Sequence, residues 1–142
     1  MILWDVNLWI YAFRQDSPNH AAAKEVLYTD LDGPEVVGFS PAVASSFLRI
    51  VTNREIFTQP SNSAESWDFI GFLEAHPNTR HVLFDDMAFG IFKHLSFIRG
   101  STGNLVPDVF LAALAVRHNC TFIAYDTGFK QYAGLDLRLL SV

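Results

Sequence analysis

The sequence predicts a three-layer α/β/α domain, in which helices cover both faces of a central, mostly parallel sheet of about five strands. Two observations predict this fold class. Short apolar runs of strand length alternate with helical segments along the whole chain, which is the pattern of parallel sheets built from strand–helix–strand units. The length of 142 residues also fits a single domain, residues 1–142, with a core of its own.

In the N-terminal half, apolar runs predict strands, and capping signals predict where helices start. Ser17-Pro18 and Ser40-Pro41 each place a capping serine before a proline at the first helical position. Asn62 and Glu65 have the spacing of a capping box. The predicted strands are Met1–Trp4 and Val36–Phe39, and the predicted helices are Leu8–Phe13, Ser17 to about Asp30, Pro41–Val51, and Asn62 up to a stop at His76.

The C-terminal half continues the alternation. Asp85 or Asp86 caps a helix, a flexible loop follows at Gly100–Asn104, and Val106-Pro107 starts the next helix. The predicted strands are Arg80–Phe84, Cys120–Tyr125 and Asp136–Leu140, and the predicted helices run from Asp85 or Asp86 to about Ile98, from Val106 to Arg117 and from Phe129 to Tyr132.

The composition is apolar for so small a domain and carries excess negative charge. Half of the residues are hydrophobic, 18% are charged, and the net charge is −5. The apolar surface predicts an interface with a second copy or another protein, and the charge does not favour general binding of polyanions. The one cysteine, Cys120, lies in an apolar run, so we expect no disulfides and a cytoplasmic location. We recognise no signal peptide and no membrane-spanning run.

Three aspartates fall where the predicted sheet would bring them together. Asp5 ends the first strand, Asp126 ends the strand Cys120–Tyr125, and Asp108 opens the helix before that strand. Open α/β sheets bind ligands at the carboxyl ends of their strands. Carboxylates held close together repel one another, and a hard divalent cation such as Mg²⁺ or Mn²⁺ relieves the repulsion. Such an ion can lower the pKa of its bound water and clamp a phosphodiester.

Each of these aspartates also has a local explanation. Asp5 and Asp126 could cap the helices that follow them, and Asp108 could complement its helix dipole. Asp85 and Asp86 are fully explained as caps and are left out of the site. The histidines lack zinc-ligand spacing, and there is no glycine-rich phosphate loop. The remaining aspartates assigned to loops or helix surfaces are Asp16, Asp30, Asp32 and Asp68.

Four stretches spread over the chain carry a family pattern: Leu3–Ala12 with its Asp-x-Asn, Phe47–Arg54 with Phe57, Asn104–Ala115, and Thr121–Phe129. Their order and spacing resemble the PIN-domain family and, within it, the VapC ribonuclease toxins of toxin–antitoxin pairs. Phe47–Arg54 is similar to a stretch that is frequent in one VapC branch. Each motif alone is weakly specific, and together they are fairly specific.

The resemblance implies a PIN-like fold and an endoribonuclease that cuts RNA with Mg²⁺ or Mn²⁺. Asp5, Asp108 and Asp126 would hold the metal that activates the attacking water. A cognate antitoxin would wrap the toxin and block these acids, and the chain would form a homodimer. The side chains that would orient the carboxylates or hydrogen-bond a metal-bound water are Asn7, Ser46, Asn104 and Thr127. The candidates for contacts with RNA phosphates are Arg14, Arg49 and Arg54, for which ordinary solvated surface charge is an equal explanation.

One position departs from the family. Most members carry a glutamate near the start of the helix after the second strand, which by register falls at Ser46, and serine cannot supply a negative charge. The usual four-acid pocket is therefore reduced to three, as often happens in the branch that shares Phe47–Arg54. The alternative function is a catalytically weakened PIN-like module that binds RNA or an antitoxin without cleavage.

Two other families also cluster aspartates at strand ends. A phosphoacceptor receiver domain needs an acidic neighbour beside Asp5 and a lysine directly after a later strand, whereas Lys130 lies beyond Asp126 in a helix. A haloacid-dehalogenase-type phosphatase needs Asp-x-Asp at the first strand, and Asn7 breaks that motif. Both families are therefore disfavoured.

Overall fold

The strands form one parallel sheet of five, in the order β3-β2-β1-β4-β5. The structure, a computed structural model, describes residues 1–142 apart from the side chain of Arg99. Its elements are β1 (Ile2–Trp4), α1 (Val6–Phe13), α2 (His20–Leu31), β2 (Val37–Phe39), α3 (Pro41–Val51), α4 (Ser63–Ala75), β3 (Thr79–His81), α5 (Asp86–Arg99), η1 (Gly103–Leu105), α6 (Val106–Arg117), β4 (Thr121–Ala124), η2 (Thr127–Gln131) and β5 (Asp136–Leu139).

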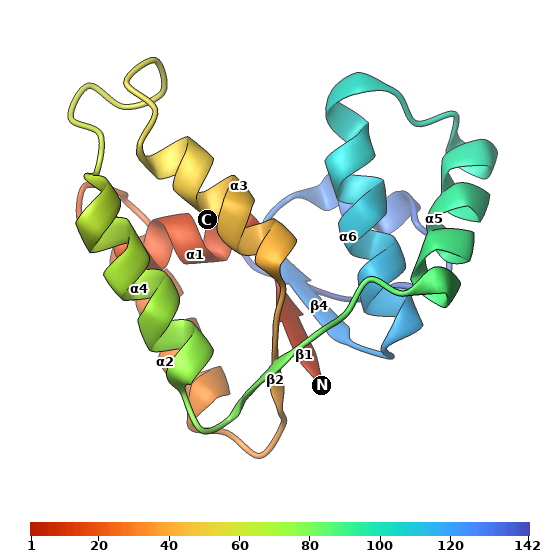
Figure 1. The fold of residues 1–142 in the computed structure, drawn as a ribbon, viewed down its shortest axis with the longest axis horizontal. Coiled ribbons are helices and arrows are strands. Elements are labelled where there is room, and N and C mark those ends of the chain that lie inside the picture. Colours follow the sequence, from red (N-terminus) through yellow and green to blue (C-terminus); the bar gives the residue numbers. More distant parts are fainter.

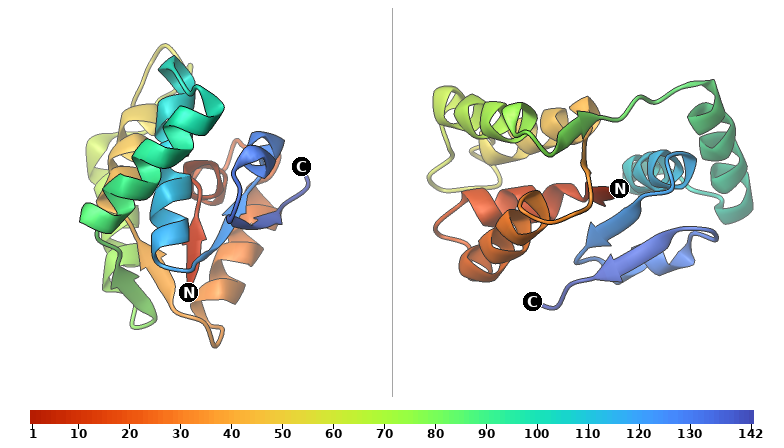
Figure 2. Two further views of the ribbon diagram at one scale, coloured as in Figure 1. Left: turned by 90° about the vertical axis from the view of Figure 1, so that its right-hand side faces the viewer. Right: turned by 90° about the horizontal axis from the view of Figure 1, so that it is seen from below.

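Helices cover both faces of this sheet (Figure 1). The right-hand view of Figure 2 shows α1 to α4 on one side of the strands, and α5, α6 and η2 on the other. α1 packs against α2 and α3, while α5 packs along α6. The predicted three-layer architecture with a parallel sheet is therefore confirmed. None of the helices in the described part of the chain combines the length and apolar character needed to cross a membrane.

The strand order reverses at β1. The chain runs outward from β1 to β2 and β3, and then returns to β4 on the other side of β1. Trp4 pairs with Ile123 in the register of β1 and β4, and the backbone N–H of Asp5 donates to the carbonyl of Ile123 at 2.9 Å. The carboxyl ends of β1 and β4 are therefore neighbours at the switch point, where open α/β sheets bind their ligands.

Two predicted boundaries differ from the structure for local reasons. The second helix begins at His20 rather than after Ser17, because the Ser17 hydroxyl accepts a hydrogen bond from the Asn19 N–H at 3.2 Å and holds a turn there. The strand predicted to reach Phe84 ends at His81. Phe84 leaves the sheet and stacks on Phe110 of α6, with ring centroids 4.0 Å apart.

Asp30 was expected on a helix surface, and that assignment is wrong. The residue is only 6% exposed. Its carboxylate accepts a hydrogen bond from the indole N–H of Trp4 at 2.8 Å and from the guanidinium of Arg138 at 3.0 and 3.1 Å. Asp30 thus joins α2 to β1 and to β5, which is why a charged side chain is tolerated at a buried position.

The two edge strands are short and carry charged side chains. β3 consists of three residues and exposes Arg80 and His81. β5 consists of four residues and exposes Asp136 and Arg138. The strands between them are buried, so the apolar core lies around β1, β2 and β4.

Candidate acid site at the strand switch point

Asp5 occupies the N-cap position of α1 without acting as a cap. It is 4% exposed, and its side chain makes no capping hydrogen bond. Burial raises the pKa of Asp5 to about 7. The backbone N–H groups of Val6 and Asn7 oppose this rise, and the carboxylates of Asp108 and Asp126 add to it. The local explanation of Asp5 as a helix cap therefore does not account for its side chain.

Asp108 lies half-buried in the first turn of α6. Burial raises the pKa of Asp108, and the negative charge of Asp126 raises it further. The negative charge of Asp108 in turn adds to the rise in the pKa of Asp5. Among the described groups, no cationic side chain contributes to the pKa of either residue.

Asp126 is exposed and does cap the turn that follows it. Its Oδ1 atom accepts a hydrogen bond from the N–H of Gly128 at 2.7 Å. Its Oδ2 atom has no hydrogen bond within the described part of the chain. Asp126 can therefore act as a cap and still interact with the other two acids, because the cap uses its Oδ1 atom and the interaction depends on its negative charge.

The donor chemistry of these acids fits a divalent cation, although their present positions do not form a finished cage. As the side chains stand, no group of three or more Asp, Glu, His or Cys residues in the described part is arranged to hold an ion. Carboxylate oxygens are the ligands that Mg²⁺ prefers, and a cation would relieve the repulsion that raises the pKa of Asp5. Asp108 and Asp126 are accessible enough for their carboxylates to turn toward Asp5.

The other polar residues predicted for the site surround it loosely. Asn7 is partly buried in the first turn of α1, whereas Asn104 in η1 and Thr127 in η2 are exposed. Ser46 lies on α3 and faces the first turns of α6 across a cleft. Within the described structure, none of the four donates a side-chain hydrogen bond to the three acids.

The Arg14 side chain is buried and bound by other parts of the chain. It is 8% exposed, and its guanidinium donates to Asp16 at 2.5 and 2.9 Å, to the Ser61 hydroxyl at 3.0 Å and to the Gln59 carbonyl at 3.0 Å. It also lies 3.8 Å from the centre of the Phe57 ring. These contacts fasten the loop before α4 to the end of α1.

Arg49 and Arg54 are exposed on the surface. They, rather than Arg14, have guanidinium groups that are open to a phosphate.

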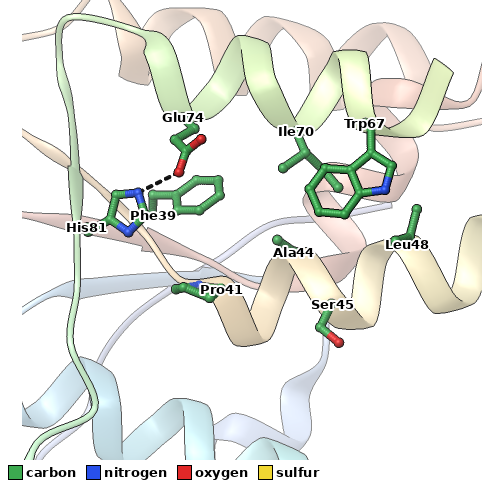
Figure 3. Close-up of a pocket in the computed structure, with 9 residues that line it drawn as sticks. All are labelled: Phe39, Pro41, Ala44, Ser45, Leu48, Trp67, Ile70, Glu74 and His81. Carbon is green, nitrogen blue, oxygen red and sulfur yellow. Dashed lines mark hydrogen bonds and ion pairs between the residues drawn. The ribbon is translucent and has the colours of Figure 1, made fainter. Parts of the chain in front are cut away.

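Two cavities lie on opposite sides of α3, and sequence reasoning missed both. The larger, of about 370 Å³, separates α3 from α4 and contains none of the three acids. Figure 3 shows Trp67 at one end of it and the ion pair of Glu74 with His81 at the other. The smaller, of about 290 Å³, lies between α3 and α6. Its residues are far apart in sequence, and no local pattern marks them.

Comparisons with known proteins give matches over nearly the whole chain. The PIN-domain family model matches residues 2–135. VapC ribonuclease Mb2897 of Mycobacterium bovis is 31% identical over 138 residues, which cover 97% of this chain and 94% of that protein. Ribonuclease VapC31 of Mycobacterium tuberculosis is 32% identical, with 95% of each chain covered. A crystal structure of VapBC2 from Rickettsia felis, bound to a promoter DNA fragment, aligns with a TM-score of 0.69 over 98% of both chains; at 17% identity it supports the fold alone.

Proposed function

The chain belongs to the PIN-domain family and to its VapC ribonucleases, and from this premise we propose that it is the toxin of a toxin–antitoxin pair and cuts RNA at the acid site with Mg²⁺ or Mn²⁺. The observation that carries the proposal is the environment of Asp5. Its carboxyl is buried at the switch point, has no cationic partner in the described part of the chain, and interacts with two further aspartates. A site of uncompensated negative charge in a water-poor position favours a cation.

Asp5, Asp108 and Asp126 would hold the metal in this proposal. When bound, a divalent ion supplies positive charge facing the phosphodiester and a water of lowered pKa. Asp5 is fixed at the strand end by its own N–H, which donates to Ile123. Asp108 lies in the first turn of α6, and Asp126 caps η2 just after the end of β4. The side chains proposed to orient the carboxylates and their waters are Asn7, Ser46, Asn104 and Thr127.

RNA would be held by few basic side chains. With a net charge of −5, the chain as a whole repels a polyanion, so affinity depends on local cations. Arg49 and Arg54 are the exposed candidates for phosphate contacts.

We propose an antitoxin and a second copy of the chain as protein partners. Support comes from apolar side chains gathered on α5 and on the segments that flank it. The exposed residues concerned are Leu83, Met87, Phe89, Phe97, Ile98, Leu105 and Val106. Sizing chromatography of the isolated chain tests self-association, and a single monomeric peak would contradict it. A cytoplasmic location, expected from the lone cysteine, stays part of the proposal.

The test is cleavage of single-stranded RNA by purified wild type, Asp5→Asn and Asp68→Asn. Asp68 is an exposed aspartate on α4 and controls for the loss of a carboxylate elsewhere. Wild type and Asp68→Asn should cleave, chelation with EDTA should stop them, and Mg²⁺ or Mn²⁺ should restore them. Asp5→Asn should be inactive. Cleavage by Asp5→Asn at the wild-type rate, or activity that survives the chelator, would contradict the proposed mechanism.

Calorimetric titration with Mn²⁺ separates the proposal from the alternative of a binding module without activity. Heat of binding that disappears in Asp5→Asn supports a metal-dependent enzyme. A wild-type chain that binds RNA or an antitoxin but neither Mn²⁺ nor Mg²⁺ would instead be the inert module.

A further inference from the structure

The cleft between α3 and α6 opens beside the acid site. It is lined by Ala42, Ser46, Val106, Pro107, Phe110 and Leu111. Pro107 directly precedes Asp108, and Leu111 lies three residues after it, on the same side of the helix. Along α6, the residues that line the cleft therefore lie within one helical turn of Asp108.

The cleft has the size and lining of a pocket for a small, flat, mostly apolar group. Its volume of about 290 Å³ is close to the lower end of the roughly 300–1,000 Å³ typical of small-ligand sites. Ser46 supplies the one side-chain hydroxyl among its lining residues, and a hydroxyl can both donate and accept a hydrogen bond. None of the residues that line the cleft carries a charge.

Phe110 gives the cleft a fixed aromatic ring. Phe84 stacks on one face of that ring, with centroids 4.0 Å apart and planes 5° from parallel. Phe92 packs against it at 5.8 Å in an edge-on arrangement. The ring is held by these two neighbours while it also lines the cleft. Its orientation is thus set before any ligand arrives.

We propose that this cleft binds one nucleobase of the RNA substrate, next to the phosphodiester that reaches the acids. The inference rests on the proposed function and names how that site selects its substrate. Single-stranded RNA is recognised by bases that stack on aromatic side chains and hydrogen-bond through their edges. Phe110 supplies the aromatic surface and Ser46 the hydrogen bond. In the proposed function, a metal ion held by the nearby acids would attract a phosphate rather than an apolar peptide, which favours a base over a side chain of a protein partner as the occupant of the cleft.

Two small residues of α3, Ala42 and Ser45, allow a matched test. Ala42→Leu fills the cleft between α3 and α6. Ser45→Leu places the same side chain at the exposed rim of the cavity between α3 and α4, which Ser45 lines and Ala42 does not; in Figure 3 the Ser45 hydroxyl points away from Trp67. Leucine is a good helix former, so neither change should disturb α3 itself. Far-UV circular dichroism and thermal unfolding confirm that both variants are folded.

The first readout is cleavage of an RNA series in which one ribose at a time lacks its base. For wild type and Ser45→Leu, removal of the base at one position beside the cut bond should slow cleavage about 5- to 150-fold, the rate equivalent of about 1–3 kcal/mol of stacking. In Ala42→Leu that position should matter no more than its neighbours. A dependence on the same base that is unchanged in Ala42→Leu would overturn the proposal.

The second readout does not need cleavage. RNA carrying the fluorescent base 2-aminopurine at successive positions is bound to the Asp5→Asn chain, and stacking on Phe110 should quench one position only. Quenching should vanish in the double variant that combines Asp5→Asn with Ala42→Leu, and it should persist in the one that combines Asp5→Asn with Ser45→Leu. Equal quenching at every position would refute the base site, and so would quenching that Ala42→Leu does not change. The second result would favour a protein partner as the occupant of the cleft. Selective quenching with no cleavage by wild type would refute the nuclease alone.

Ser46→Ala separates the hydrogen bond from a role at the metal. Loss of a base-edge hydrogen bond should reduce the preference among the four bases, and it should slow cleavage of base-containing RNA more than cleavage of the base-free substrate. An equal loss of rate on every substrate, the base-free one included, would show that Ser46 acts on the metal-bound water instead, and would remove it from the base site.

Discussion

Replacing Asp5 by asparagine should stabilise the metal-free chain at neutral pH, although it removes the residue proposed to be essential for cleavage. The pKa of Asp5 is about 7 in the folded chain, against 3.8 for an ordinary aspartate. Below pH 3.8 the carboxyl is protonated whether the chain is folded or unfolded, and it costs nothing. Between these values the folded state binds the extra proton, so stability falls as the pH rises, and the full penalty is present above pH 7.

The magnitude follows from the same two pKa values. At about 1.4 kcal/mol per pKa unit, the gap between 3.8 and about 7 corresponds to about 4 kcal/mol. Only part of this penalty is present at pH 5, so the free energy of unfolding should fall by about 3 kcal/mol between pH 5 and pH 8. Asparagine is nearly isosteric and carries no charge. Its side-chain oxygen can still face the N–H groups of Val6 and Asn7, which oppose the rise in the pKa of Asp5.

Urea unfolding in EDTA, at several values between pH 5 and pH 8, measures this effect. The stability of wild type relative to Asp5→Asn should decrease by about 3 kcal/mol over that range, and Asp68→Asn should follow wild type. Taking the difference between variants removes the contribution of the histidines, which titrate in all of them. A difference between wild type and Asp5→Asn that is the same at pH 5 and pH 8 would refute the reasoning about burial and charge.

Three further outcomes are expected. Mn²⁺ should raise the unfolding temperature of wild type and leave that of Asp5→Asn unchanged, because only a chain with the acid site gains binding energy; equal shifts would place the ion elsewhere. Gly38→Ala should cost about 1–3 kcal/mol in urea unfolding, since a Cβ there would lie 2.6 Å from Val82, whereas Gly71→Ala, with open space around it in α4, should gain about 0.5–1 kcal/mol. Asp30→Ala should lower the free energy of unfolding by about 1–3 kcal/mol by leaving a buried indole N–H without its acceptor, and a variant as stable as the wild type would contradict that assignment.

The order of the elements could be predicted because it depends on local patterns. Apolar runs mark the strands, and capping residues such as Asn62 and Asp85 accept the hydrogen bonds that their positions predict, from Glu65 and Ala88. The position of Asp5 follows from topology, because an acid that directly follows a strand must lie at the carboxyl end of that strand. Its burial does not follow, since burial depends on how the helices close over that end.

Contacts between distant segments could not be predicted from one sequence. Arg14 looks like a surface charge, yet its partners include Ser61, 47 residues away. Asp30 looks like a helix-surface acid, yet Arg138, 108 residues away, binds it. The residues of the cleft between α3 and α6 likewise come from two helices that are separated along the chain by α4, β3, α5 and η1. Patterns of polarity indicate which residues avoid water, but not which of them meet.

The charged, short strands at the two margins of the sheet restrict how this chain can associate with other polypeptides. An intruding strand would find only three or four residues of backbone to pair with, flanked by Arg80 on one margin and by Asp136 and Arg138 on the other. Fibrillar stacking through the sheet is thereby discouraged, even though half of the sequence is hydrophobic. Association through side chains of the helical layers is favoured instead, and neutralising those marginal charges should make the protein precipitate more readily.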